Sequence, residues 1–285
     1  MRTADPRIVL GLHRSRHERR LLTGALDLGV TELDTSSNYL NFLSHETLRR
    51  TAADLLPRFT VSTKVGYFPR PDRAEHSLDP LRLRTAVEQT ARDLGREPDL
   101  VFLHNPEHSV QGPISQGRDA LAQACTALDD ATTRGMCGAW GVASWDPAPL
   151  AGLINGITPR PSVLMVRAGL LVGTRTLVAA EALSAAWSLA ESALRGMSPF
   201  GGSTNVPVWD RVDPRFFLRD GDGLSRMQAV FRAAYHLPPV RAVAVGTDDP
   251  AHLRELVGAL AHEVDEWAIR EYRRLLRSRP PGQPA

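Results

Sequence analysis

A chain of 285 residues, 42% hydrophobic and 23% charged, can bury a substantial core, which excludes an intrinsically disordered protein. The formal net charge of +2 provides no basic field for nucleic acid, and no apolar run reaches the roughly 18 residues that a membrane-spanning helix needs. Residues 1–7 are polar and lack the apolar region of a signal peptide, so we expect a cytoplasmic protein without nucleic-acid or membrane partners.

Eight short apolar runs are distributed along the chain. They are continuous rather than alternating, as expected of strands that are covered on both faces. The expected strands are 7–11, 30–35, 59–64, 99–104, 138–143, 162–167, 193–198 and 241–246.

Stretches with apolar residues at 3.6-residue spacing lie between the runs and indicate amphipathic helices. They cover 18–28, 44–56, 80–94, 117–133, 176–189, 224–235 and 250–260. At the last of these, Asp249 provides a cap before a proline in the first helical position, Pro250.

Strands that alternate with helices predict an α/β fold, a (β/α)8 TIM barrel that forms a single domain over residues 1–285. The alternative is a doubly wound open sheet, which usually has a glycine-rich turn after its first strand, and 11–14 is not such a turn. An extra C-terminal helix is expected at about 262–277, packed across the barrel through Val264, Trp267, Ile269 and Leu275. The Pro/Gly-rich tail 278–285 is expected to be disordered.

Cation usage singles out one residue. Among 34 basic residues, Lys64 is the one lysine. A surface cation tolerates exchange to arginine, but a site that needs a compact ammonium with an adjustable pKa does not. The two cysteines, Cys125 and Cys137, match no metal or redox motif, so we expect buried thiols and no metal site.

Polar side chains end three successive expected strands, with Asp34 on the second, Lys64 on the third and His104 on the fourth. Tyr39 follows Asp34 by five residues. Active sites of such barrels lie at the carboxyl ends of the strands. An ammonium lowers the pKa of a neighbouring phenol, which can then donate a proton to a carbonyl oxygen. Each residue alone could be a cap, a packed ring, a surface cation or a core histidine, but the four together predict an active site.

Three segments resemble the aldo-keto reductase family. Residues 25–39 read Ala-Leu-Asp-Leu-Gly-Val-Thr-Glu-Leu-Asp-Thr-Ser-Ser-Asn-Tyr, residues 62–66 read Ser-Thr-Lys-Val-Gly, and residues 99–106 read Asp-Leu-Val-Phe-Leu-His-Asn-Pro. Weaker similarity at 141–144, 198–201 and 245–246 extends the resemblance, in order, from about residue 7 to 260. Residues 102–107 are similar to the sugar-dehydrogenase branch that is related to galactose dehydrogenases.

This resemblance implies a barrel that transfers hydride between NAD(P)H and a carbonyl. It implies that Tyr39 is the proton donor, that Lys64 and Asp34 tune it, and that His104 orients the carbonyl.

The cofactor side departs from the family pattern. Ser144 stands at the place of an asparagine that holds the nicotinamide carboxamide, Met165 at that of a glutamine, and Met197 at that of a stacking aromatic ring. After the eighth strand, Gly246, His252 and Leu256 stand at the places of a lysine, an arginine and an adenine-facing asparagine. The residues expected to bind NADP or NAD are Ser144, Met165, Met197, Ser198, Gly201, Gly202, Gly246, Thr247, His252 and Glu255. Weak binding is expected, with a tilt towards NAD, because Asp248 and Asp249 would repel a 2′-phosphate.

The loop after the first strand is unusually basic. It is either the solvated start of a helix or a substrate-binding loop, in which case His13, Arg14 and Arg16 would bind an anionic group. Trp145 is expected to help wall the pocket. The expected substrate is a small, sugar-like carbonyl compound. If the basic loop binds it, the substrate also carries an anionic group.

Three functions remain in view. The first is an NAD(P)(H)-dependent oxidoreductase that acts on a small carbonyl or the matching alcohol. The second is a cofactor-independent lyase, dehydratase or isomerase that uses the same quartet as acids and bases. The third is a non-catalytic binding or regulatory subunit, which would have no need of a tuned phenol. The reaction direction, the substrate, the choice of NAD or NADP and the oligomeric state stay open at this point.

Overall fold

In the computed structural model, which describes residues 7–278, eight parallel strands close into a barrel in the order β1-β10-β9-β8-β7-β6-β3-β2. They are β1 (Ile8–Gly11), β2 (Glu32–Asp34), β3 (Thr60–Val65), β6 (Leu100–His104), β7 (Ala139–Ser144), β8 (Val163–Arg167), β9 (Leu194–Met197) and β10 (Ala242–Val245). Leu10 of β1 pairs with Leu33 of β2 on one side and with Val245 of β10 on the other. This closure confirms the (β/α)8 prediction and excludes the open sheet.

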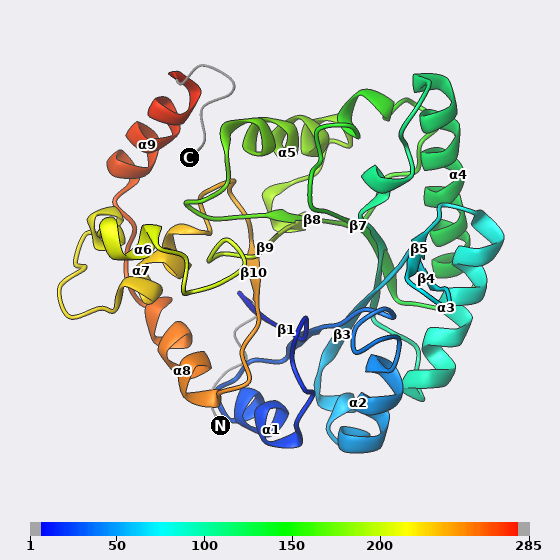
Figure 1. The fold of residues 1–285 in the computed structure, drawn as a ribbon, viewed down its shortest axis with the longest axis horizontal. Helices are drawn as coiled ribbons and strands as arrows, with labels where there is room; N and C mark the ends of the chain where they lie inside the picture. Colours follow the sequence, from blue (N-terminus) through cyan, green and yellow to red (C-terminus); the bar gives the residue numbers. More distant parts are fainter. Residues whose placement is uncertain (1–6, 279–285) are drawn as a thin grey trace.

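Helices surround the barrel (Figure 1). They are α1 (Arg19–Asp27), α2 (Ser44–Ala52), α3 (Pro80–Leu94), α4 (Ile114–Thr133), α5 (Thr174–Ala186), α7 (Arg226–Ala233), α8 (Pro250–Ala259) and α9 (Glu266–Ser278). Shorter elements are the helix α6 (Val208–Arg211) and the 3-10 turns η1 (Leu56–Arg58), η2 (Pro106–His108), η3 (Ala151–Leu153), η4 (Glu191–Ala193) and η5 (Pro214–Phe217). None of these described helices combines the length and apolarity that spanning a bilayer requires.

The barrel interior is filled rather than hollow. Val9, Phe102 and Met165 are at most 1% exposed and form its centre together with small side chains such as Ala143. A Cβ on Gly141 would lie 2.8 Å from the Phe102 ring and 2.5 Å from a backbone oxygen of β8, so only glycine leaves room for Phe102. With its interior packed, the barrel offers its strand ends to a ligand.

The expected C-terminal helix is present, but its packing face differs from the prediction. Val264 and Ile269 are buried as expected, whereas Trp267 is 60% and Leu275 53% exposed. The helix begins at Glu266, and spacing from Ile269 turns Leu276 inward instead. The helix does not cross the barrel but lies outside it, next to α5 and α7 (Figure 1). Ser278, expected in a disordered tail, ends this helix, and 279–285 lie outside the described residues.

A hairpin that the sequence analysis did not predict follows β3. Its strands, β4 (Tyr67–Pro69) and β5 (Ala74–His76), pair antiparallel. Each strand has three residues, too few for an alternating pattern to be visible. The hairpin matters because it brings Tyr67 and His76 to the carboxyl edge of the barrel.

The cysteines are confirmed as buried, unpaired thiols. Burial raises the pKa of Cys125 to about 12, so its thiol is unreactive near neutral pH.

Candidate active site

The ammonium of Lys64 stands at the centre of a buried polar cluster. Its side chain is 3% exposed and forms an ion pair with Asp34. Lys64 Nζ also donates to the backbone oxygen of Thr35 at 2.8 Å and to the hydroxyl of Tyr39 at 3.2 Å. These three acceptors use all three hydrogens of the ammonium. Ser62 Oγ donates to the other carboxylate oxygen of Asp34 at 3.0 Å, a supporting contact that the sequence analysis missed.

Strand register explains the meeting of Asp34 and Lys64. Asp34 pairs with Ser62 across β2 and β3, and Lys64 lies two residues further on the same face of β3. Tyr39 returns to the cluster through a turn in which its backbone N–H donates to the oxygen of Ser36 at 3.2 Å.

His104 ends β6 beside this cluster. Its Nδ1 lies 3.2 Å from Ser36 Oγ, and its ring is 6.4 Å from that of Tyr39 in an edge-to-face contact. Its Nε2 makes no hydrogen bond to any residue between 7 and 278, which leaves that atom for a ligand. All four predicted catalytic residues therefore meet at one place.

The electrostatics set the protonation states. Burial alone would lower the pKa of Lys64, but Asp34 and Tyr39 outweigh it and raise the pKa. Burial raises the pKa of Tyr39 against the opposing pull of Lys64. Burial, aided by the charge of Lys64, lowers the pKa of His104 well below its ordinary value. The resting cluster therefore holds a cationic lysine, a protonated phenol and a neutral imidazole.

This result corrects one expectation from the sequence. The ammonium does favour the phenolate, but the cost of burying a phenolate is larger, so the net pKa of Tyr39 moves up. Near neutral pH the phenol of Tyr39 thus keeps its proton.

A second phenol, that of Tyr67, packs edge-to-face against His104, with ring centroids 4.9 Å apart. Its hydroxyl accepts from Asn105 Nδ2 at 3.3 Å and lies 3.1 Å from Nδ1 of His108. His76 contacts the Tyr67 ring edge-to-face at 4.9 Å and bonds the backbone oxygen of His104 at 2.7 Å. Sequence reasoning missed these residues because the unpredicted hairpin brings two of them into place.

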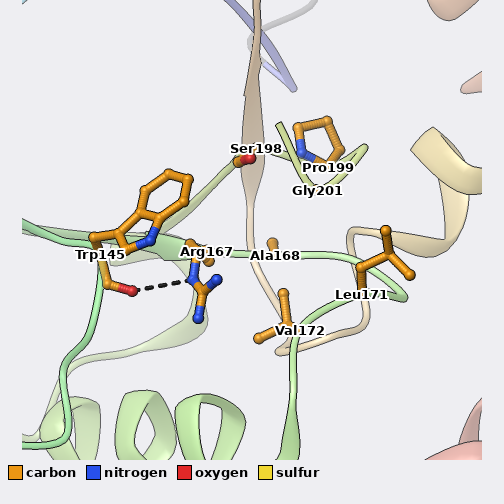
Figure 2. A pocket seen from close by; sticks show the side chains of 8 residues that line it. All are labelled: Trp145, Arg167, Ala168, Leu171, Val172, Ser198, Pro199 and Gly201. Carbon is orange, nitrogen blue, oxygen red and sulfur yellow. Dashed lines mark hydrogen bonds between the residues drawn. The ribbon is translucent and has the colours of Figure 1, made fainter. Parts of the chain in front are cut away.

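A small hollow opens at the carboxyl ends of β7, β8 and β9 (Figure 2). It is lined by Trp145, Arg167, Ala168, Leu171, Val172, Ser198, Pro199 and Gly201. Arg167 Nε donates to the backbone oxygen of Trp145 at 3.1 Å, and its guanidinium lies 5.0 Å from the indole centroid. Three of the predicted ligand-binding residues, Trp145, Ser198 and Gly201, thus line one cavity.

Glu107 supports this side of the site. Its buried carboxylate accepts from Ser144 Oγ at 3.0 Å and from the backbone N–H groups of Trp145 and Asp146 at 2.7 and 2.9 Å. Burial nevertheless raises its pKa. Ser144 is fully buried in this arrangement, and its hydroxyl hydrogen is committed to Glu107. Glu107 ends the segment 102–107 singled out in the sequence, but its support of this loop was not predicted.

The two methionines differ in accessibility. Met165 is 1% exposed inside the barrel, so it presents almost no surface to a ligand in this conformation. Met197, at the end of β9, is only partly buried against the same cluster. Next to it, Ser198, Gly201 and Gly202 have φ values of 57°, 72° and 99°. A Cβ on Gly202 would meet nothing within 4 Å, so the turn is open on that side.

The remaining predicted cofactor residues lie after β10. Gly246 is exposed, and the Thr247 hydroxyl exchanges hydrogen bonds with the backbone of Asp249. Asp249 caps α8 by accepting from Ala251 N at 2.8 Å. His252 and Glu255 are exposed on that helix.

A nicotinamide dinucleotide fits this edge better at one end than at the other. The open left-handed turn at 198–202 can direct backbone N–H groups at a pyrophosphate, and Arg167 adds a positive charge to the hollow. At α8, by contrast, the carboxylates of Asp248 and Asp249 occupy the region that the family pattern assigns to a 2′-phosphate. The turn at 198–202 and Arg167 therefore suit the pyrophosphate of a dinucleotide, whereas Asp248 and Asp249 place negative charge at the start of α8.

The basic loop after β1 divides into two parts. Arg16 is paired with Glu18 at 3.1 Å and Asp248 at 3.6 Å, so its charge is already compensated. Arg14 is exposed, and its charge helps burial to lower the pKa of His13. The ring of His13 lies 5.1 Å from that of Tyr39, which places this residue next to the catalytic phenol.

The model of the aldo/keto reductase family matches residues 13–183, more than half of the chain. No curated protein sequence matches this chain. An aldo-keto reductase from Bacillus halodurans, in its holo form, has a TM-score of 0.73 at 18% identity over 95% of this chain and 91% of that chain. The aldose reductase from Giardia lamblia has a TM-score of 0.69 at 15% identity, over 98% and 94%. An aldo-keto reductase from Klebsiella pneumoniae in complex with NADPH has a TM-score of 0.69 at 17% identity, over 98% and 93%.

Proposed function

Because the chain belongs to the aldo/keto reductase family, we propose that it is an NAD(P)(H)-dependent oxidoreductase that reduces a small carbonyl or oxidises the matching alcohol. The observation that carries the proposal is the continuous contact from Asp34 through Lys64 to Tyr39, beside a neutral His104. A protein that only binds a ligand does not need a buried ammonium whose hydrogen bonds position a phenol.

The chemistry follows from the protonation states. Tyr39 donates its proton to the carbonyl oxygen as that oxygen becomes an alkoxide, and Lys64 stabilises the phenolate that remains. In the tautomer of His104 that carries the ring proton on Nε2, the imidazole can polarise the same oxygen. A nicotinamide bound here would supply the hydride for the carbonyl carbon. Met197, Ser198, Gly201 and Arg167 are the residues that would hold it.

A second candidate is the cofactor-independent lyase, dehydratase or isomerase on the same barrel. The burial of Met165 and the two carboxylates at α8 favour it, because both weaken a nicotinamide site. In that reaction the phenol of Tyr39 and the imidazole of His104 would act as acid and base without a hydride donor.

Calorimetric titration of purified protein with NADPH, NADH and their oxidised forms separates the two candidates. We expect dissociation constants from about one to tens of micromolar, or about 7–8 kcal/mol. We also expect NADPH to be preferred over NADH by less than about tenfold, because Asp248 and Asp249 oppose a 2′-phosphate. Binding should be accompanied by cofactor-dependent turnover of short aldehydes, followed at the nicotinamide absorbance. If none of the four forms binds at millimolar concentration, the hydride-transfer proposal is wrong and the second candidate replaces it.

A further inference from the structure

A chain of hydrogen bonds leads from the ammonium of Lys64 to the loop after β1. Lys64 Nζ donates to the backbone oxygen of Thr35 at 2.8 Å, and the hydroxyl of Thr35 lies 2.6 Å from that of Ser44, the first residue of α2. Ser44 Oγ in turn lies 2.6 Å from Nε2 of His17. The side chains of Thr35, Ser44 and His17 are fully buried, and the chemistry proposed above uses none of them.

The direction of this chain is fixed by His17. Its Nδ1 lies 3.0 Å from the backbone oxygen of Ser15, an atom that can only accept, so Nδ1 carries the ring proton. Burial lowers the pKa of His17, which keeps the ring neutral near pH 7 and leaves Nε2 without a proton. Nε2 therefore accepts from the hydroxyl of Ser44, and Ser44 accepts from the hydroxyl of Thr35. Each hydroxyl hydrogen of the chain thus has one defined acceptor.

Two other segments hold His17 in place. Its backbone adopts a left-handed conformation with φ of 57°, which is uncommon for a residue other than glycine. Its N–H donates to Ser15 Oγ at 3.1 Å, and its backbone oxygen accepts from Thr51 Oγ1 of α2 at 3.3 Å. Ser15 Oγ is itself anchored, because it donates to the carboxylate of Asp248 at 2.8 Å. Strained conformations that the surrounding structure enforces in this way cluster at functional sites.

The inner end of the chain is the backbone acceptor of Lys64. The ammonium has three hydrogens in a tetrahedral arrangement. With one hydrogen on Asp34 and a second on the oxygen of Thr35, the direction of the third, towards Tyr39, is determined. A shift of the Thr35 carbonyl would therefore turn the ammonium relative to the phenol.

We propose that His17 and Ser44 are positioning residues, which fix the carbonyl of Thr35 and thereby direct the ammonium of Lys64 at the phenol of Tyr39. The inference rests on the proposed function and adds to it two residues that lie outside the quartet. Lys64 stabilises the phenolate that forms as the proton leaves, so a misdirected ammonium weakens the transition state rather than substrate binding. The loss is therefore expected in kcat and not in KM.

The first test uses changes of nearly equal size at Thr35. Thr35→Val removes the hydroxyl that Ser44 holds, and we expect kcat to fall by about 10-fold, the effect of one good hydrogen bond, with KM within about 2-fold of wild type. Thr35→Ser keeps the hydroxyl and should retain most of kcat. Thr90→Val, which removes a buried hydroxyl on α3, is the matched control and should leave both constants unchanged. Equal kcat values for Thr35→Val and Thr35→Ser overturn the proposal.

A second pair of variants tests His17. In His17→Gln the amide oxygen can still accept from Ser44 Oγ, whereas the side chain of His17→Leu is of similar size and has no acceptor. We expect His17→Gln to retain most of kcat and His17→Leu to lose about 10-fold. Ser44→Ala, a smaller change, should show the same loss and replaces His17→Leu if that variant does not fold. Variants that melt at lower temperature but keep the kcat of the wild type would show a role in stability alone and contradict the proposal.

The third test needs neither turnover nor cofactor. Because Lys64 is the one lysine of the chain, protein labelled with ¹³C at lysine Cε gives a single NMR signal that reports on this ammonium. The two Hε protons should be resolved in the wild type, since three acceptors hold the side chain rigidly. Their separation should be lost in Ser44→Ala and kept in Thr90→Val. An unchanged signal in Ser44→Ala overturns the proposal whatever the reaction is, whereas failure of the proposed function alone would abolish turnover and leave the effect on the signal intact.

Discussion

The ammonium of Lys64 donates to the hydroxyl of Tyr39 at 3.2 Å, although the two residues approach the carboxyl edge of the barrel from different elements. Lys64 is held on β3 by its ion pair with Asp34, while Tyr39 lies in the loop after β2. This contact links a fixed charge to a group that can lose a proton, and the predictions below probe it first.

Replacement of Tyr39 by Phe should lower kcat by about 10²–10⁴, the usual contribution of one positioned acid. The phenol is half-buried and the ring is retained, so the melting temperature should change little. Steady-state kinetics with a short aldehyde, together with thermal unfolding, check both statements. Unchanged turnover would remove Tyr39 from the mechanism.

The pH profile of reduction follows from the same phenol. Because burial raises the pKa of Tyr39 above its ordinary value of 10.0, the phenol stays protonated throughout the neutral and mildly alkaline pH range. The lowered pKa of His104 keeps the imidazole neutral over that range. We expect kcat for reduction to be flat from pH 6.5 to 9, measured in buffers of constant ionic strength. A decline centred between pH 7 and 8 would contradict these protonation states.

Lys64→Arg should be nearly as inactive as Lys64→Met. All three hydrogens of the ammonium are used by Asp34, Thr35 and Tyr39 within a space that leaves 3% of the side chain exposed. A planar, larger guanidinium cannot reproduce that geometry. Activity assays of the two variants test this expectation. The substitution Arg254→Lys, at an exposed residue, is the control for the reverse exchange. Full activity of Lys64→Arg would show that the ammonium is dispensable.

Arg14→Ala and Arg16→Ala should differ, although the sequence analysis grouped the two residues. Arg16 is paired with Glu18 and Asp248, whereas Arg14 is exposed beside His13. For a carboxylate-bearing aldehyde, Arg14→Ala should raise KM several-fold with little change in kcat, as expected for uniform binding. Arg16→Ala serves as the matched control and should leave KM within about 2-fold. Equal KM values for both variants and the wild type would show that the loop is only the solvated start of a helix and does not bind substrate.

Acid stability should depend on His45. Burial, with smaller contributions from His17 and Lys64, lowers its pKa to about 4, and its Nε2 lies 2.8 Å from Thr63 Oγ1. Between pH 6.5 and 4 the unfolded chain binds a proton at His45 that the folded chain does not, so folding weakens as the pH falls through this window. The loss reaches about 3 kcal/mol.

Urea unfolding at pH 7 and pH 4.5 measures that loss. His45→Gln keeps an amide that can bond Thr63 but has no proton to gain, so its stability should fall by about 2–3 kcal/mol less than that of the wild type. The same pH dependence in both proteins would show that His45 is not the group responsible.

Much of the barrel could be predicted because its strands are buried on both faces. Each of the eight expected strands lies within two residues of the observed one at both ends, since continuous apolar runs are bounded by polar turns. Asp34, Lys64 and His104 could be placed together for a similarly simple reason: the carboxyl ends of parallel strands share one edge.

Contacts between distant segments could not be predicted in this way. The hairpin of β4 and β5 has strands of three residues and no visible periodicity, so Tyr67 was not connected with His104. Arg14 and Arg16 differ partly because Asp248, more than 230 residues away in the chain, pairs with Arg16.

The amino-acid sequence by itself determined the barrel, the positions of the strands and the shared strand-end edge of Asp34, Lys64 and His104, because strand burial and strand-end chemistry are local properties of the chain. The tertiary structure alone decided that burial raises the pKa of the Tyr39 phenol, that Glu107 supports the loop at Trp145, and that the ring of His104 contacts both Tyr39 and Tyr67. Each of these depends on how much water is excluded from a group and on which distant side chains reach it. Burial and proximity of that kind exist only once the barrel has closed.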